Sequence, residues 1–186
     1  MGCPDTELVQ RWQQGDLTAF EALVRHWQQP VGRFLGRFVG REDQAHDLCQ
    51  EVFLRIYLAG PRYQATGAFS TWLYRIAINV ARDAARRARR TPGPLPDVEV
   101  PSPQDTADVA CQRQELIGLV AQAVANLPEP LRLVLVLHHY ERMNFEAIGR
   151  LTDTPASTLK SRFASALKHL RARLQPLGLG PEEFEP

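Results

Sequence analysis

Aromatic residues and arginines are concentrated in the segment GAFSTWLYRIAINVARDAARRARR, residues 67–90. Apolar positions recur at helical spacing, which predicts a single helix. Its core stripe would contain Leu73, Ile76, Ala77, Val80 and Ala84. The other side would be basic, with an amide and an indole at its border: Arg75, Arg82, Arg86, Arg89, Asn79 and Trp72. A core helix needs no such face, and a face that only has to be soluble would include more acidic residues.

The loop before this helix adds Tyr63, Phe69 and Ser70. Rings beside guanidinium groups suit a single-stranded nucleic acid, because bases stack on the rings while the cations hold phosphates. Asn79 is placed to hydrogen-bond the edge of a splayed base. Taken singly, Trp72 and Phe69 are better interpreted as core residues, but the combination favours nucleic acid.

A second basic face is predicted on residues 155–174, PASTLKSRFASALKHLRARL. The core side would contain Leu159, Phe163, Leu167, Leu170 and Leu174. The opposite side combines short hydroxyls with cations: Ser157, Thr158, Lys160, Ser161, Arg162, Ser165 and Lys168. Such a surface suits the major groove of duplex DNA, although a solvated amphipathic helix has the same pattern. A short helix capped by Asn144 and a turn precede it, which is typical of a helix-turn-helix.

A third candidate surface lies in DLCQEVFLRIY, residues 47–57. Helical spacing buries Leu48, Cys49, Val52, Phe53 and Ile56. The remaining face is acidic and apolar, with one arginine at its edge: Asp47, Gln50, Glu51, Leu54 and Arg55. Such a face can dock a protein partner. From the residues alone, an ordinary solvated face explains it better.

The elements that position these residues are predicted to be helices throughout, since strand-type alternation is nowhere sustained. In the first half we expect a helix over residues 5–14, one capped by Asp16, one opened by Pro30 and ended near Gly40, and one over residues 43–58. In the second half we expect helices over 107–126 and 129–142, then a short helix from Phe145, and a last one that Thr154 caps.

Five of the 14 prolines fall within residues 91–106, where they exclude a regular helix or a central strand. We therefore predict an all-α fold of two small helical domains joined by a flexible, proline-rich linker. The expected boundaries are residues 5–90, a linker over 91–106, a second domain over 107–175 and an acidic tail over 176–186.

The 186 residues carry a net charge of only +1, but two basic segments flank an acidic one, which is the charge distribution that matters for nucleic acid. Cys3, Cys49 and Cys111 are widely spaced, which fits unpaired thiols in a reducing cytoplasm. The pair His138 and His139 points in two directions on a helix. We expect no metal site, no cofactor, no catalytic residue and no membrane insertion.

Together these segments resemble the extracytoplasmic-function (ECF) sigma factors, the small two-domain members of the sigma-70 family. The resemblance covers residues 5–174. It rests on GDLTAFEALVRHW (15–27), DLCQEVFLRIY (47–57), FSTWLYRIAINVARD (69–83) and LPEPLRLVLVLHHYERMNFEAIGRLTDTPASTLKSRFASALKHLR (127–171).

The resemblance implies a role for each surface. The first domain would be sigma region 2, in which Asp47, Gln50, Glu51, Leu54 and Arg55 bind core RNA polymerase. Promoter DNA at the minus-ten element would be held by Tyr63, Phe69, Ser70, Trp72, Arg75, Asn79, Arg82 and Arg86. The second domain would be sigma region 4, whose last helix reads the minus-thirty-five element. The family commonly pairs with an anti-sigma factor.

The predicted function is therefore promoter recognition and DNA melting as a subunit of RNA polymerase. Two alternatives stay open. An autonomous helix-turn-helix regulator would need only residues 155–174, and would have no use for aromatics and Asn79 beside an arginine-rich helix. A helical interaction protein that binds no DNA would need neither basic segment.

Overall fold

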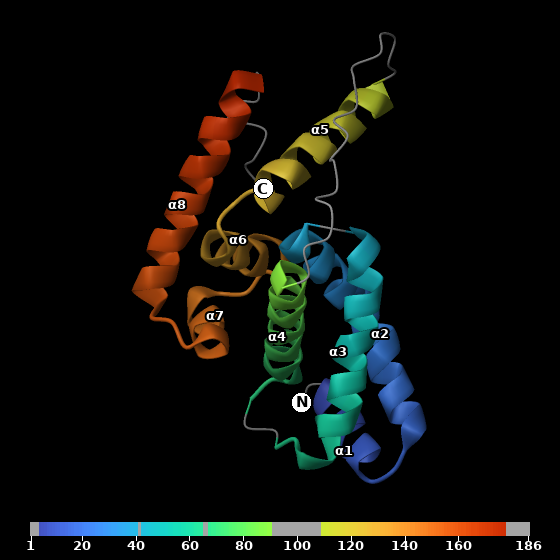
Figure 1. Ribbon diagram of the computed structural model, residues 1–186. Helices are drawn as coiled ribbons and strands as arrows, with labels where there is room; N and C mark the ends of the chain where they lie inside the picture. Colours follow the sequence, from blue (N-terminus) through green and yellow to red (C-terminus); the bar gives the residue numbers. More distant parts are fainter. Residues whose placement is uncertain (1–3, 41, 65–66, 91–108, 178–186) are drawn as a thin grey trace.

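The computed structural model describes residues 4–40, 42–64, 67–90 and 109–177 as two packed groups of helices (Figure 1). The N-terminal unit contains α1 (Pro4–Gln13), α2 (Leu17–Val39), α3 (Glu42–Ala59), the 3-10 turn η1 (Gly60–Arg62) and α4 (Phe69–Arg90). The C-terminal unit contains α5 (Val109–Ala125), α6 (Glu129–Leu135), the π-helical η2 (Val136–Tyr140), α7 (Phe145–Thr152), α8 (Ala156–Leu174) and η3 (Gln175–Leu177). No strand occurs among the described residues, and the all-α prediction is confirmed. The predicted linker and most of the predicted tail lie outside them.

Helix α2 begins and ends at the residues that the sequence indicated. The Asp16 carboxylate accepts hydrogen bonds from the backbone N–H groups of Thr18 and Ala19, and Gly40 ends the helix with a φ of 75°. Hydrogen bonds from the Thr18 hydroxyl and from Arg11 lower the pKa of Asp16 to about 2, so the cap stays ionised at neutral pH. Asp16 is therefore confirmed as the N-cap.

The prediction that Pro30 begins a new helix is wrong, because α2 continues through it. Proline inside a helix costs about 3 kcal/mol, since its N–H is missing and its ring crowds the preceding turn. The buried stripe of α2 runs across this position, from Leu23 before it to Val31 and Phe34 after it. Burial of these side chains on both sides outweighs the local cost.

The N-terminal core lies where α2, α3 and α4 meet. Phe34 and Leu35 from α2, Val52 and Ile56 from α3, and Leu73 from α4 are fully buried. Burying a side chain of this kind contributes about 1.5–3 kcal/mol. Helix α4 is therefore held by its apolar stripe, and its polar side faces away from the bundle.

The C-terminal unit has the helix-turn-helix that the sequence predicted. Asn144 caps α7 by accepting a hydrogen bond from the backbone N–H of Ala147, and Asp153 makes the turn with a φ of 51°. The Thr154 hydroxyl, predicted to cap the next helix, instead donates to the carbonyl of Thr152, and Pro155 occupies the cap position of α8. The helix predicted over 129–142 changes to π geometry at Val136 and ends at Tyr140.

One predicted core residue of α8 is wrong. Leu159 and Leu174 are buried and Phe163 and Leu170 are partly buried, but Leu167 is 46% exposed. Around the helix Leu167 lies about 80° from Leu159, whereas Ala166 lies within about 20° of it. Ala166 is fully buried, and α8 packs on α6 and α5. A small residue at the centre of the stripe places the larger Leu167 at its exposed edge.

The two units contact each other directly. Helix α2 packs against α5, α6 and the π-helical segment, and α4 packs against α7, as Figure 1 shows for the last pair. Buried residues of both units form one continuous hydrophobic cluster. The sequence did not predict this contact.

Gly60 is a site where one methyl group is expected to disturb the fold. A Cβ added there would collide with the indole of Trp12, which is buried and packs on Phe20. We predict that Gly60→Ala lowers the free energy of unfolding by about 1–3 kcal/mol in urea denaturation, as overpacking does.

Gly32→Ala is the matched control, because a Cβ at Gly32 meets open space inside α2. Removing a helical glycine there should stabilise the protein by about 0.5–1 kcal/mol. Equal effects of the two substitutions would contradict the packing described for Trp12.

Candidate nucleic-acid interface and partner-binding surface

The basic face of α4 is continuous along the helix. Arg75, Asn79, Arg82 and Arg86 follow one another at intervals of three or four residues, which places them on one side. Arg75, Asn79 and Arg86 are exposed, and the Arg82 side chain is 41% exposed. Four polar side chains therefore follow one another along one side of α4, each at least partly exposed.

A cluster of rings lies at the N-terminal end of this face. The rings of Tyr63 and Trp72 stack with centroids 4.2 Å apart at an angle of 29°. Both side chains are half-buried, and Ser70 in the first turn of α4 is half-buried too. A stacked pair of rings is the kind of platform on which a base can add a further layer.

Phe69 does not fit the direct DNA contact predicted for it. Its ring is 4% exposed and packs against Trp27, Tyr63 and Trp72, with centroids 5.8–6.4 Å away. A buried ring offers no free face to a base. Phe69 instead supports the two rings that remain accessible, which agrees with the core interpretation of this residue taken singly.

The arginines of α4 have protein partners in this structure. The Arg82 Nε atom donates to Glu129 Oε1 at 2.8 Å, and Arg75 Nη2 donates to the carbonyl of Arg150 at 2.7 Å. Arg86 forms an ion pair with Asp83 on the same helix. Two of the three cations are thus engaged by the C-terminal unit.

Helix α3 carries the surface predicted to bind a partner. Leu48, Val52, Phe53 and Ile56 are buried as predicted, and Cys49 is half-buried. Asp47 and Gln50 are exposed, and Leu54 is 57% exposed. The structure therefore brings two polar groups and an apolar side chain together on the outer side of α3.

Glu51 and Arg55 lie at the border of this surface, where α3 meets α4. Arg55 donates to Asp83 Oδ2 at 2.9 Å and to Glu51, and Arg87 donates to Glu51 at 3.1 Å. Burial acts to raise the pKa of Glu51, but the two arginines outweigh it and the pKa is lowered. These two residues therefore join α3 to α4.

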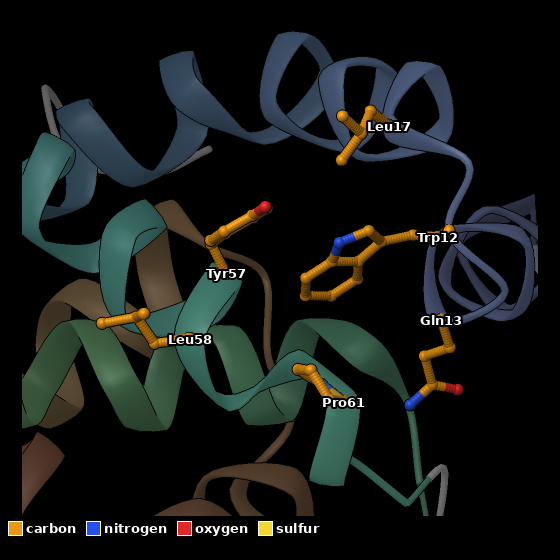
Figure 2. Close-up of a pocket in the computed structure, with 7 residues that line it drawn as sticks. Trp12, Gln13, Leu17, Tyr57, Leu58 and Pro61 are labelled. Atoms are coloured by element: carbon orange, nitrogen blue, oxygen red, sulfur yellow. The ribbon is translucent and has the colours of Figure 1, made fainter.

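A shallow groove of 360 Å³ extends the α3 surface beyond the residues predicted (Figure 2). Its walls include Trp12 and Leu17 on one side and Tyr57 and Leu58 on the other. Leu58 is 68% exposed and lies one turn after Leu54. Sequence reasoning missed it, although the spacing of four from Leu54 was the available signal.

Helix α8 presents the second basic face. Ser157, Lys160, Ser161 and Lys168 are exposed, and Thr158, Arg162 and Ser165 are half-buried. The predicted residues are thus all accessible on one helix, which follows the turn of the helix-turn-helix.

Comparison with known families agrees with both helical units. Residues 23–91 match the family described as "Sigma-70 region 2", and residues 117–170 match "Sigma-70, region 4". The chain belongs to the sigma-70 family. It is 35% identical to the RNA polymerase sigma-H factor of Pseudomonas aeruginosa, over 93% of this chain and 95% of that protein. It is 34% identical to the ECF RNA polymerase sigma-E factor of Haemophilus influenzae, over 93% and 96%.

A solved structure shares the fold of this sigma-70 family member. It contains the sigma factor RpoE in complex with the anti-sigma factor NepR from Bartonella quintana. The likeness has a TM-score of 0.65 at 18% identity, and covers 84% of this chain and 96% of that one. Separately, none of the helices described combines the length and hydropathy needed to cross a membrane.

The joint between α3 and α4 can be tested through Asp83. Hydrogen bonds from Arg55 and then Arg86 lower the pKa of Asp83 below its ordinary 3.8. We predict that Arg55→Ala raises this pKa toward 3.8, as measured by NMR titration of the carboxyl carbon. A lowered folded-state pKa stabilises the fold above about pH 3.8, and this contribution is lost as the pH falls through the lowered value.

Arg25→Ala is the control, since Arg25 pairs with Glu21 on the surface of α2. The pKa of Asp83 should not change in that variant. An unchanged pKa in Arg55→Ala would show that Arg55 does not hold Asp83.

Proposed function

We propose that this chain recognises promoters as a sigma subunit of RNA polymerase, and that α4, α3 and α8 each supply one of its surfaces. The observation that carries the proposal is the arginine face of α4 beside the Tyr63–Trp72 stack. A regulator that binds only duplex DNA does not need stacked aromatic rings beside an arginine face. Residues 5–90 would act as region 2, residues 107–175 as region 4, and residues 91–106 as the linker between them.

At the minus-ten element the proposed contacts are to a melted strand. Stacking of an unpaired base on an aromatic ring is worth about 1–3 kcal/mol, which offsets the few kcal/mol that extracting the base costs. Tyr63 and Trp72 would supply the stacking, and Asn79 would hydrogen-bond the base edge. Arg75, Arg82 and Arg86 would hold phosphates further along the strand.

At the minus-thirty-five element the proposed contacts are to duplex DNA. The hydroxyls of Ser157 and Ser161 are short enough to let α8 lie in the major groove, where base edges are distinguishable. Lys160, Arg162 and Lys168 would reach the phosphate backbone and fix the position of the helix.

The exposed side of α3 is the proposed contact with core polymerase. Leu54 would form its apolar centre and Asp47 and Gln50 its polar rim, and the groove beside Leu58 would extend it. An apolar centre with a polar rim is typical of protein interfaces. Because RpoE is bound by an anti-sigma factor in the related structure, we also propose an anti-sigma partner for this chain.

The proposed role is not catalytic and needs no cofactor. Binding energy alone would select the promoter and hold the melted strand. We place this activity in the cytoplasm, where RNA polymerase and chromosomal DNA meet.

Transcription from a promoter library tests the proposal directly. With purified core polymerase, the chain should direct new run-off transcripts from a subset of fragments. Arg75→Ala/Arg82→Ala should reduce them at least tenfold, because a hydrogen bond to a charged group is worth about 1.5–3 kcal/mol. Binding to core polymerase should stay within about twofold, since charge contacts far from that surface contribute little to it.

Arg25→Ala/Arg33→Ala removes the same charge from the exposed side of α2 and should leave transcription unchanged. No new transcripts with a competent core enzyme, or loss of core binding in the first variant, would contradict the assignment of α4.

The α8 contacts can be tested through their salt dependence. Each phosphate contact releases counterions and contributes about −0.9 to the slope of log K against log salt concentration. Lys160→Ala/Arg162→Ala should therefore flatten the slope for promoter duplex by about 1.8. An unchanged slope would show that these side chains do not reach the DNA backbone.

A further inference from the structure

The end of α1 lies against the turn that leads into the stacked rings. Trp12 is buried, and its indole occupies the space into which a Cβ at Gly60 would point. The next residue, Gln13, is exposed, and its side chain extends from α1 toward the chain around Pro61, as Figure 2 shows. The 3-10 turn η1 begins at Gly60 and is followed directly by Tyr63, one ring of the stacked pair.

The Gln13 amide joins both ends of this turn. Its Nε2 atom donates to the carbonyl of Gly60 at 2.9 Å and to the carbonyl of Tyr63 at 2.7 Å. The backbone N–H of Tyr63 donates to the same Gly60 carbonyl at 3.0 Å. Two of the hydrogen bonds that close the turn therefore come from one side chain on another helix.

Few kinds of side chain can make this contact. Both partners are carbonyl oxygens, so the contact needs two N–H donors at the end of a flexible stem. A primary amide supplies two such donors and an ionised carboxylate supplies none, while asparagine is one methylene shorter. Methionine matches the length of glutamine but has no donor, so the contact depends on the amide and not on the size of the side chain.

The backbone that carries the Gln13 side chain is held on both sides. Trp12 packs on Phe20 with ring centroids 4.8 Å apart, which fixes the last turn of α1 on the bundle. Arg11 forms an ion pair at 2.7 Å with Asp16, the N-cap of α2. The amide is therefore attached to a rigid support.

Tyr63 lies where the chain leaves the 3-10 turn. Its φ of −68° and ψ of 126° are those of extended backbone. Its ring packs on Phe69 and Trp72, but its hydroxyl lies 3.5 Å from the Gly67 carbonyl, which is long for a hydrogen bond. Within the part of the chain that the structure describes, the two Gln13 hydrogen bonds are the shortest polar contacts of this turn.

From these contacts we infer that Gln13 is a positioning residue of the minus-ten surface: by fixing the turn from Gly60 to Tyr63, it holds the Tyr63 ring on Trp72 in the orientation on which an unpaired base stacks. The inference rests on the proposed function of that ring pair. A ring that is already held loses less conformational freedom when a base binds, so the base binds more tightly. If Gln13 only fastened α1 to the bundle, its loss would not act through Tyr63.

The first test observes the ring pair in the full-length chain by NMR. An indole that stacks on a tyrosine shifts the signals of the tyrosine ring protons upfield. Gln13→Met removes both donors without changing the charge, and should move the Tyr63 ring signals toward their positions in Trp72→Ala. Gln13→Lys restores N–H donors and should return the signals toward their wild-type positions.

Gln10→Met is the matched control, because Gln10 is an exposed glutamine one turn earlier in α1. The Tyr63 signals should not change in this variant. Unchanged signals in Gln13→Met, equal changes in Gln13→Met and Gln10→Met, or no recovery in Gln13→Lys would overturn the positioning role.

The second test measures base stacking in the purified complex of the full-length chain with core polymerase. The probes are two fluorescein-labelled 12-nucleotide single strands, one random in sequence and one abasic throughout. The ratio of their affinities isolates the contribution of the bases, because both strands carry the same phosphates. Tyr63→Ala should lower this ratio about fivefold, as expected for one lost stacking contact. Gln13→Met should lower it about threefold, as one lost hydrogen bond does, and Gln10→Met should leave it unchanged.

A double-mutant cycle separates positioning from a general effect on the fold. In the Tyr63→Ala background, Gln13→Met should not lower the ratio further, because the ring that it positions is absent. An equal loss in both backgrounds would overturn the inference. Failure of the proposed function looks different: Tyr63→Ala would then leave the ratio unchanged, while the NMR signals would still respond to Gln13→Met.

Discussion

Burial of Leu73, Ala77 and Val80 in the N-terminal bundle is the interaction on which the rest of the structure depends. It fixes the rotation of α4 about its axis, and a helix has only one orientation that buries these three positions. The arginine face must then point outward, and the Tyr63–Trp72 stack must lie at its N-terminal end. A basic surface that follows the backbone and rings on which bases stack are the two parts of a site for single-stranded DNA.

The outward arginines impose a second constraint. A guanidinium gains little from an exposed ion pair, so isolated partners on the surface contribute about 0–1 kcal/mol each. Asp83 nevertheless pairs with Arg55, and Glu51 with Arg87, and these two pairs join α3 to α4. Asp83 also pairs with Arg86 within α4. Glu129 engages Arg82 from the other unit. The same weakness that makes such pairs poor sources of stability makes them easy to exchange for phosphates.

Local signals in the sequence predicted the helices and most of their buried sides. Caps such as Asp16 and Asn144 act within a few residues, so the neighbouring sequence was sufficient to predict them. The helix start predicted at Pro30 was wrong because burial against other helices outweighs the local cost of the proline. The sequence of one segment does not show that burial. Leu167 was predicted to be buried because helical spacing does not separate the edge of an apolar stripe from its centre. The small Ala166 is the buried residue at that centre.

The sites divide in the same way. Spacing along α4 and α8 was sufficient to place their basic faces, and the extension of the α3 surface to Leu58 was within reach of the same logic. Phe69 was included with the accessible rings because periodicity does not distinguish a ring on a surface from a ring beneath one. The pairing of Arg75 and Arg82 with Arg150 and Glu129 joins residues 47 or more positions apart. Contacts at that separation depend on how the two units pack, and no local pattern encodes it.

The most direct measurement of the central claim is the reactivity of promoter thymines toward permanganate, which oxidises unstacked bases. It would use a promoter that the chain and core polymerase transcribe together. We expect reactive thymines in the minus-ten region only when both the chain and core polymerase are present, and we expect them to be lost in Arg75→Ala/Arg82→Ala. If the chain alone protected the duplex and no thymine became reactive with core polymerase, the chain would be an autonomous duplex reader, and the role assigned to α4 would be wrong.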